Sequence, residues 1–151
     1  MNDEFYMMLA LEEAQKAEEM DEVPVGAVIV DEHHQVIGQG FNRPISTNDP
    51  TSHAEINALR MASKRLNNYR LTQTTLYVTI EPCIMCMGAI IHARIKRVVF
   101  GASDPKWGAV LSLYAMASDH RLNHRPEIKS GVCEEKTRQI IKNFFMNKRS
   151  K

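Results

Sequence analysis

Three side chains of this 151-residue chain have the types and spacing of a metal site, namely His53, Cys83 and Cys86. The cysteines stand three positions apart in P-C-I-M-C at 82–86, and residues three apart share one face of a helix. A helix N-terminus also favours the thiolate, the form that binds metal. Three protein ligands with one open position are typical of catalytic zinc, whereas structural zinc uses four. The alternative for the cysteines is a redox pair, which has the same C-x-x-C spacing.

Glu55 follows His53 by two positions, in the segment H-A-E. A carboxylate next to a metal ligand, but not itself a ligand, can take a proton from water and return it to a leaving group. The alternative is an exposed glutamate in a first helical turn, where the helix dipole favours acids. Cys133 and the other histidines lack metal-ligand spacing, and we expect Cys133 to be buried at the end of a strand.

The elements that must position these residues follow from hydrophobic periodicity and turn signals. Helices are expected over 4–20, 53–66, 82–94 and 134–147, with Phe5, Met8, Leu9 and Leu11 on the apolar side of the first and Ile56, Leu59 and Met61 in the core. Strands are expected over 25–30, 36–41, 75–80, 97–101 and 127–132. Residues 42–52 are expected to form an ordered loop, whereas residues 102–126 and the direction of the last strand remain unassigned. Alternation at βαβ spacing indicates an α/β fold, a central sheet covered by helices.

The length and composition indicate a single domain, residues 1–151, of an ordinary globular protein with 44% hydrophobic and 25% charged residues. No apolar run reaches the roughly 18–20 residues that cross a bilayer, so no membrane partner is expected. The first residues lack the basic start and apolar stretch of a signal peptide. Three cysteines, an odd number, argue for a reducing compartment, and we expect a cytoplasmic protein.

The net charge of +1 hides an uneven distribution. Residues 1–22 hold eight acids and one base, a net charge of −7, so the remainder carries +8. Residues 136–151 hold six bases and no acid. Such segments are either solvated helix faces or interaction surfaces. Phe144 and Phe145 lie among the C-terminal bases, a combination that suits flexible RNA. Because they are adjacent on a helix, one is expected in the core and the other at the periphery.

The motif H-A-E at 53–55 with P-C-I-M-C at 82–86 resembles the signature of the zinc-dependent cytidine deaminase superfamily. Further segments resemble its tRNA-specific adenosine deaminases along nearly the whole chain, among them E-V-P-V-G-A-V at 22–28, G-F-N-R-P-I at 40–45, N-Y-R-L at 68–71 and N-H-R at 123–125. The resemblance implies a cytidine deaminase-like three-layer α/β/α sandwich with a mixed five-stranded central sheet. It also implies one Zn²⁺ per subunit, a tRNA anticodon stem-loop as partner, and a homodimer.

Within that resemblance His53, Cys83 and Cys86 bind zinc, and Glu55 shuttles protons while a zinc-bound hydroxide deaminates the wobble adenosine to inosine. Positions matching the family's substrate-binding residues are Asn42, Val25, Ala54, Asp104, Lys106, Asn123, His124 and Phe145. Asn42 is otherwise a turn residue and Val25 otherwise plain core. The chain departs from the family where Trp107 replaces a usually small residue and Leu111 a common glycine. Trp107 is either a stacking platform or a cap on the core.

Two other functions remain open at this level. One is deamination of a free base or nucleoside, against which the basic and aromatic C-terminal helix argues, because a small substrate does not need it. The other is a non-catalytic zinc subunit that binds RNA, against which Glu55 argues, because a binding module needs no proton shuttle.

Overall fold

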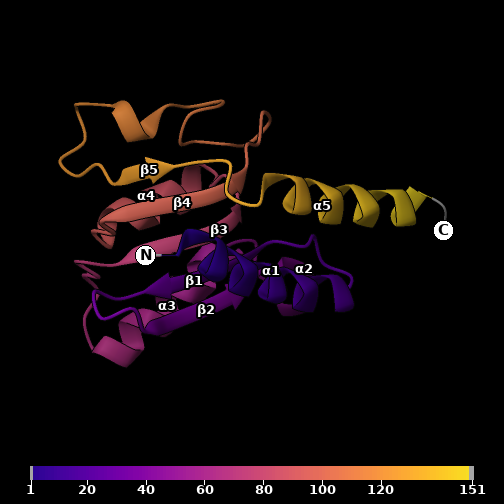
Figure 1. Cartoon of the computed structure of the whole chain (residues 1–151), viewed down its shortest axis with the longest axis horizontal. Coiled ribbons are helices and arrows are strands. Elements are labelled where there is room, and N and C mark those ends of the chain that lie inside the picture. The colour runs from indigo at the N-terminus through magenta and orange to yellow at the C-terminus, as the bar shows by residue number, and fades with distance from the viewer. Residues whose placement is uncertain (1, 150–151) are drawn as a thin grey trace.

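The computed structural model describes residues 2–149 and contains a five-stranded sheet in the order β2-β1-β3-β4-β5 (Figure 1). The strands are β1 (Gly26–Val30), β2 (Val36–Phe41), β3 (Thr75–Ile80), β4 (Arg97–Ala102) and β5 (Glu127–Lys129). Strand β1 is antiparallel to β2 and β3, whereas β3, β4 and β5 run parallel. The sheet is therefore mixed, as expected, and its last strand is parallel to its neighbour.

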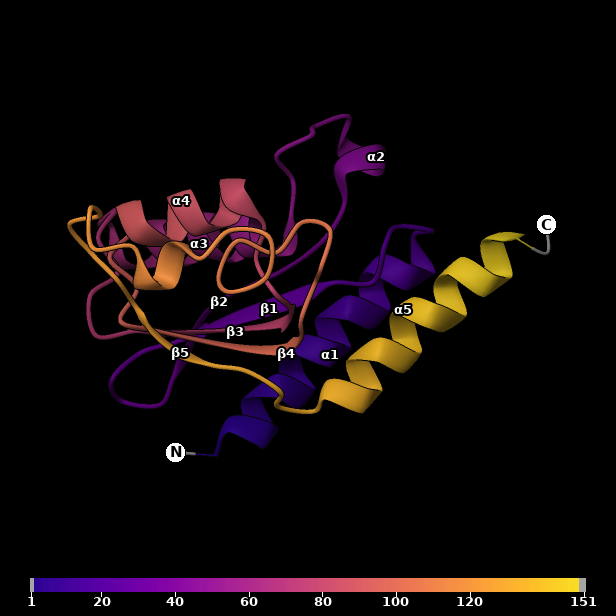
Figure 2. The same ribbon diagram turned by 90° about the horizontal axis from the view of Figure 1, so that it is seen from above.

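Helices cover both faces of this sheet (Figure 2). Helices α1 (Asp3–Glu19) and α5 (Glu134–Arg149) lie on one face, and α3 (Ala54–Leu66) and α4 (Ile84–His92) lie on the other. A short helix α2 (Pro44–Thr47) projects beside the sheet, and a 3-10 helix, η1 (Met116–Ser118), interrupts the long segment after β4. The three-layer α/β/α sandwich is thus confirmed.

The strand sequences explain why both faces are covered. In β1 all five residues are buried. Ala27 and Ile29 belong to the core beneath α3 and α4, and Val28 and Val30 belong to the core beneath α1. Successive side chains of a strand point to opposite faces, so a continuous apolar run requires a cover on each side.

The expected apolar side of the first helix was partly wrong, although Leu11 is buried as expected and Leu9 packs partly buried against the core. Phe5 and Met8 are 56% and 40% exposed, whereas Tyr6, Met7, Ala10, Ala14 and Ala17 face the sheet. The small alanines allow α1 to approach so closely that a Cβ on Gly26 would lie 2.0 Å from the carbonyl oxygen of Ala10. Backbone proximity selects this buried side, and hydrophobicity alone does not reveal it.

Four boundaries or contacts also differ from expectation. Residues 42–52 contain α2, which starts with Pro44 at its first turn and ends where Asn48 adopts a left-handed backbone with φ 53°. Strand β5 stops at Lys129, three residues early. Helix α4 starts at Ile84, after Pro82 and Cys83. Met61, expected in the core, is 48% exposed, while Ile56 and Leu59 are buried as expected.

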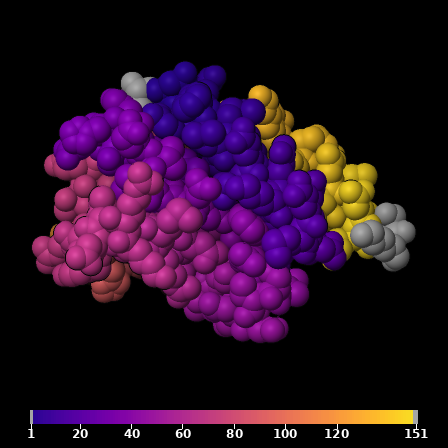
Figure 3. All heavy atoms as spheres, turned by 90° about the horizontal axis from the view of Figure 1, so that it is seen from below, coloured from indigo at the N-terminus to yellow at the C-terminus, as the bar shows by residue number. Residues whose placement is uncertain are grey.

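Helices α1 and α5 lie side by side, α1 in indigo and α5 in yellow in Figure 3. Asp21, just after α1, forms an ion pair with Lys148 near the end of α5 at 2.6 Å. Phe144 is 7% exposed and Phe145 43% exposed, which confirms that one faces the core and the other the periphery. No helix within residues 2–149 is long and apolar enough to span a membrane.

Candidate metal centre and its pocket

His53 and Cys83 occupy equivalent positions at the starts of two helices. Each is the residue immediately before its helix, α3 for His53 and α4 for Cys83, with extended backbone dihedrals. Neither side chain caps its own helix. Cys86 lies in the first turn of α4, where it is fully buried. The two helix starts thus bring together three residues that are separated by up to 33 positions.

The three ligand atoms have the spacing that zinc requires. The Nδ1 atom of His53 lies 3.6 Å from the Sγ atom of Cys83 and 3.5 Å from that of Cys86. All three atoms fall within 4.8 Å of one another. Zinc ligands at about 2.3 Å for sulfur and about 2.05 Å for nitrogen lie about 3.6 Å apart at tetrahedral angles. The residues therefore fit a zinc ion, which the family signature leads one to expect.

The two thiols differ in their protonation. Hydrogen bonds that the Cys83 sulfur accepts from Cys86 and from His53 lower the pKa of Cys83 despite its partial burial. The hydrogen bond to Cys83 and deeper burial raise the pKa of Cys86. One sulfur of the pair is therefore predisposed to the thiolate form that metals bind.

Glu55 lies in the first turn of α3 and is 3% exposed. The alternative, an exposed glutamate in a first helical turn, therefore does not hold. Burial raises the pKa of the Glu55 carboxyl to about 7. A carboxyl group with a pKa near neutrality can both accept and donate protons under ordinary conditions. Its side chain lines the same cavity as His53 and Cys83.

This cavity has a volume of about 450 Å³ and is lined mainly by apolar atoms around the metal centre. Asn42, just after β2, lines it and donates a hydrogen bond from Nδ2 to the carbonyl oxygen of Val23 at 3.2 Å. Val25, just before β1, lines it too. Ala54, next to His53, is fully buried in the core under α3 and does not line the cavity.

The loop after β4 supplies another wall. Asp104 and Trp107 line the cavity, whereas Lys106 is exposed on the same loop. Trp107 is 66% exposed, so it does not cap the core. The structure therefore brings Asn42, Val25, Asp104 and Trp107 to the metal centre.

Asn123 and His124 lie away from this cavity. His124 contacts the carbonyl oxygen of Ile95 through Nε2 at 2.7 Å, and Asn123 accepts a hydrogen bond from Arg94 at 3.2 Å. These partners precede β4, whereas Cys83 and Asp104 follow the carboxyl ends of β3 and β4. Because the two strands are parallel and six residues long, the two ends lie about 20 Å apart. Phe145 is on α5, across the sheet from α3 and α4.

Two buried glutamates that hold segments in or next to the pocket were not anticipated from the sequence. Glu22 is 1% exposed and accepts backbone hydrogen bonds from Ile45 and Ser46 in α2 at 3.2 and 2.7 Å. Glu81 is 2% exposed and accepts hydrogen bonds from the loop after β4. The sequence gives only a weak indication that these two acids are buried, because each merely lies next to an apolar run and a proline.

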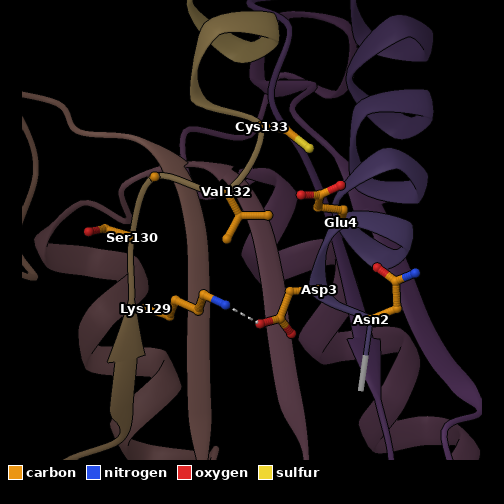
Figure 4. Close-up of a pocket in the computed structure, with 8 residues that line it drawn as sticks. Asn2, Asp3, Glu4, Lys129, Ser130, Val132 and Cys133 are labelled. Atoms are coloured by element: carbon orange, nitrogen blue, oxygen red, sulfur yellow. Dashed lines mark hydrogen bonds and ion pairs between the residues drawn. The ribbon is translucent and has the colours of Figure 1, made fainter.

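Cys133 is far from the metal ligands in the sequence, and it lines a different cavity from theirs. It lies in the turn before α5 with φ 56° and is half-buried, so the expected burial at a strand end was wrong. Its sulfur points toward Glu4 at a cavity between the starts of α1 and α5 (Figure 4). Burial raises the pKa of this thiol.

Comparison with known proteins gives concordant results. A family model for the cytidine and deoxycytidylate deaminase zinc-binding region matches residues 1–102. A Haemophilus influenzae protein named tRNA-specific adenosine deaminase is 53% identical over 147 residues, 97% of this chain and 85% of its own length. A protein of the same name from Agrobacterium fabrum is 47% identical over 144 residues, 95% and 94% of the two lengths.

Solved structures are also similar. One, from a study of A-to-I editing by tRNA:A34 deaminases at the wobble position, has a TM-score of 0.87 and 47% identity over 90% of this chain and 98% of that chain. A guanine deaminase from Bacillus subtilis has a TM-score of 0.64 and 41% identity over 68% of this chain and 66% of that chain. The similarity to the first structure extends over more of both chains.

Proposed function

The chain belongs to the zinc-binding cytidine and deoxycytidylate deaminase family, and on that premise we propose that it converts the wobble adenosine of a tRNA anticodon loop to inosine by hydrolysis. The observation that carries the proposal is the three-ligand cluster of His53, Cys83 and Cys86 with Glu55 buried beside it. Relatives named tRNA-specific adenosine deaminases cover nearly the whole chain and support this substrate.

Zinc at these three ligands would supply a Lewis acid that lowers the pKa of a bound water to about 7. Glu55 would accept the first proton of the attacking water and pass it to the ring nitrogen of adenine as the water oxygen bonds to C6. It would then take the remaining proton from that oxygen and give it to the amino group, whose bond to C6 breaks to release ammonia and leave inosine. Asn42, whose amide can both donate and accept, holds the edge of the base. Val25 and the apolar wall exclude bulk water. A base reaches this depth only after it leaves its stack, which an unpaired loop allows most readily.

The RNA partner agrees with the distribution of positive charge. Four cations line one cavity at the amino ends of β3 and β4, together with His124 and a single acid, Glu127; they are Arg70, Arg94, Lys96 and Arg125. None of these four cations has a carboxylate within 4.0 Å among the described residues. Phosphates are the chemically matched ligands. We infer that this cluster, with Asn123 and His124, contacts the RNA backbone. We infer that Lys106 near the pocket and Phe145 on α5 also contact the RNA. Lys151, the last of the six C-terminal bases, lies outside the described residues.

A homodimer is the proposed assembly. A cavity of about 460 Å³ between α3 and α4 is lined largely by apolar atoms, with Ile56, Leu59 and Ala89 in its wall and Tyr69 67% exposed at its rim. A second copy would cover this surface. A light-scattering mass of a single chain at micromolar concentration would refute the dimer. A dimeric mass that is unchanged in Ala89→Arg would refute this surface as the interface.

We also propose that residues 1–151 form one domain and that the protein works in the cytoplasm. All three cysteines are free, which is the usual state in a reducing compartment.

The decisive test is a substrate panel. The purified protein is incubated with an anticodon stem-loop that carries adenosine at the wobble position, and separately with cytidine, cytosine and guanine. Inosine from the stem-loop alone is the expected result. Activity on guanine alone would instead favour the function of the Bacillus subtilis relative. RNA binding without any turnover would favour a non-catalytic subunit.

A further inference from the structure

The loop that follows β4 is held by one buried carboxylate. The Oε2 atom of Glu81 accepts backbone hydrogen bonds from Val110, Leu111 and Ser112 at 3.1, 2.8 and 3.0 Å. Its Oε1 atom accepts one from the backbone of Asp104 at 3.1 Å and one from the Ser112 hydroxyl. Both ends of the loop therefore depend on the same side chain.

The middle of the loop is fixed as well. Asp104 Oδ1 accepts backbone hydrogen bonds from Lys106 and Trp107 at 3.1 and 3.2 Å. A Cβ on Gly108 would lie 2.4 Å from the carboxyl carbon of Glu81, so only glycine permits this approach. The backbone of Trp107 is thus fastened on both sides.

The side chain of Trp107, unlike its backbone, is largely exposed to solvent. It is 66% exposed and lines the cavity that contains His53 and Glu55. Among residues 2–149 no aromatic ring or cation stacks on its indole. A large apolar ring on a rigid loop at the mouth of a pocket is suited to stack on another flat ring.

We propose that the indole of Trp107 stacks on the nucleobase next to the reacting adenine, and that Glu81 is the positioning residue that holds the indole there. This rests on the proposed function, because it requires an oligonucleotide substrate. It makes Trp107 a determinant of which flanking nucleotides the enzyme accepts. The target adenine enters the cavity, and its neighbour remains at the rim, where the indole lies.

The first experiment pairs substitutions with altered substrates. The wild type, Trp107→Ala and Trp107→Phe are assayed on an anticodon stem-loop and on two versions in which the nucleotide before or after the target adenosine is abasic. We expect Trp107→Ala to raise the KM for the intact loop roughly 5-fold to 100-fold with little change in kcat, the range that base–aromatic stacking supplies. Trp107→Phe should restore most of the affinity.

One abasic version should raise the KM of the wild type by a similar factor and leave that of Trp107→Ala unchanged, because the stacking partner is already missing. The proposal would be overturned if Trp107→Ala had the same KM as the wild type for the intact loop. It would also be overturned if the abasic substitution raised the KM of both proteins by the same factor. A wild type that forms no inosine from any loop would instead overturn the proposed function on which it rests.

A binding readout avoids turnover. Trp107 is the only tryptophan of the chain, so intrinsic fluorescence reports on this one ring. In a Glu55→Ala background the intact loop should quench this fluorescence more than the abasic version at saturation. Equal quenching would contradict stacking.

The second experiment tests Glu81. In Glu81→Gln one acceptor oxygen becomes a donor facing backbone N–H groups, so the loop should loosen. We expect stronger acrylamide quenching of Trp107 and a KM that rises toward that of Trp107→Ala, with zinc content unchanged. The double variant should have a KM no higher than Trp107→Ala alone.

The matched control is Glu22→Gln, which removes an equally buried carboxylate that holds α2 instead, and it should leave the acrylamide quenching of Trp107 at the wild-type level. If Glu81→Gln does not fold, Ser112→Ala removes a single hydrogen bond to Glu81 and should give a smaller change in the same direction. Unchanged quenching in the folded variant would refute the positioning role.

Discussion

The Asp3 carboxylate and the Arg97 guanidinium form a two-point ion pair, with Nη1–Oδ1 and Nη2–Oδ2 separations of 2.9 and 2.8 Å. The same carboxylate accepts hydrogen bonds from Lys129 at 2.9 Å and from the Tyr77 hydroxyl at 2.8 Å (Figure 4 includes Asp3 and Lys129). Asp3 therefore joins the first turn of α1 to β3, β4 and β5 at once. The sheet is cross-linked at the end remote from the metal centre.

Substitution Asp3→Asn should lower the free energy of unfolding by about 2 kcal/mol, because it leaves a partly buried guanidinium without its charge partner. Urea unfolding followed by circular dichroism measures this. The control Asp119→Asn removes the exposed ion pair with Arg121 and should cause no measurable change. Equal stability of Asp3→Asn and the wild type would contradict the cross-link.

The contribution of Asp3 should also depend on pH. Arg97 and the other donors hold the pKa of Asp3 well below its ordinary value of 3.8. A lowered pKa stabilises the folded state above the unfolded pKa, and this stability is lost as the pH falls toward the folded pKa. The difference in unfolding free energy between wild type and Asp3→Asn should be constant from about pH 7 to about pH 5 and narrow below about pH 4. A difference that widens in acid would contradict this assignment.

Removal of one sulfur should empty the metal centre. Cys83→Ser is expected to lose zinc, measured by elemental analysis of the dialysed protein, and to form no inosine. Cys133→Ser serves as the control, because its sulfur lies beside Glu4 at the start of α1. This control should keep one zinc per chain. Zinc loss in Cys133→Ser would call for a different ligand set.

Substitution Glu55→Gln should separate binding from chemistry. The amide retains the shape of the buried side chain but cannot take up and return the proton, so kcat should fall by roughly 10²-fold to 10⁴-fold. Zinc content and the Kd for the anticodon stem-loop should stay near the wild-type values. Retained turnover would refute the proton-shuttle role.

RNA affinity should fall steeply with salt, because each phosphate contact releases counterions. The slope of log Kd against log salt should decrease by about one for Arg94→Ala or Arg125→Ala if each binds one phosphate. Arg121→Ala offers a control, since Arg121 is already paired with Asp119 at 2.7 Å. A flat salt dependence in the wild type would count against an RNA substrate.

Sequence reasoning located the metal centre because its evidence is local. Cys83 and Cys86 need only helical spacing, and a helix start before Ala54 supplies His53. The central strands β1, β3 and β4 were also predicted, since each is a short apolar run that is almost wholly buried. The three ligands meet because β2 and β3, which precede α3 and α4, run in the same direction on either side of β1. The ligand residues alone do not specify this arrangement.

The errors have a common physical origin in long-range packing. The buried side of α1 is set by alanines against Gly26, which no periodicity of large hydrophobic residues reveals. Glu22 and Glu81 are buried acids whose partners are backbone N–H groups 23 or more positions away. Asn123 and His124, which the resemblance predicts on the RNA-contacting surface, lie at the other end of the strands from the pocket, and their contact with RNA stays a prediction.

Glu22 holds α2 and Glu81 holds the loop after β4 through backbone hydrogen bonds, so the exposed side chains of Ile45 and Trp107 are not needed to fix these segments. Residues such as Ile45 and Trp107 can therefore change identity while the segment keeps its course. For protein engineering this means that substrate range can be varied at the loop tips by combinatorial libraries that leave both glutamates and the metal ligands untouched. The same separation offers evolution a low-risk route from one nucleic-acid context to another.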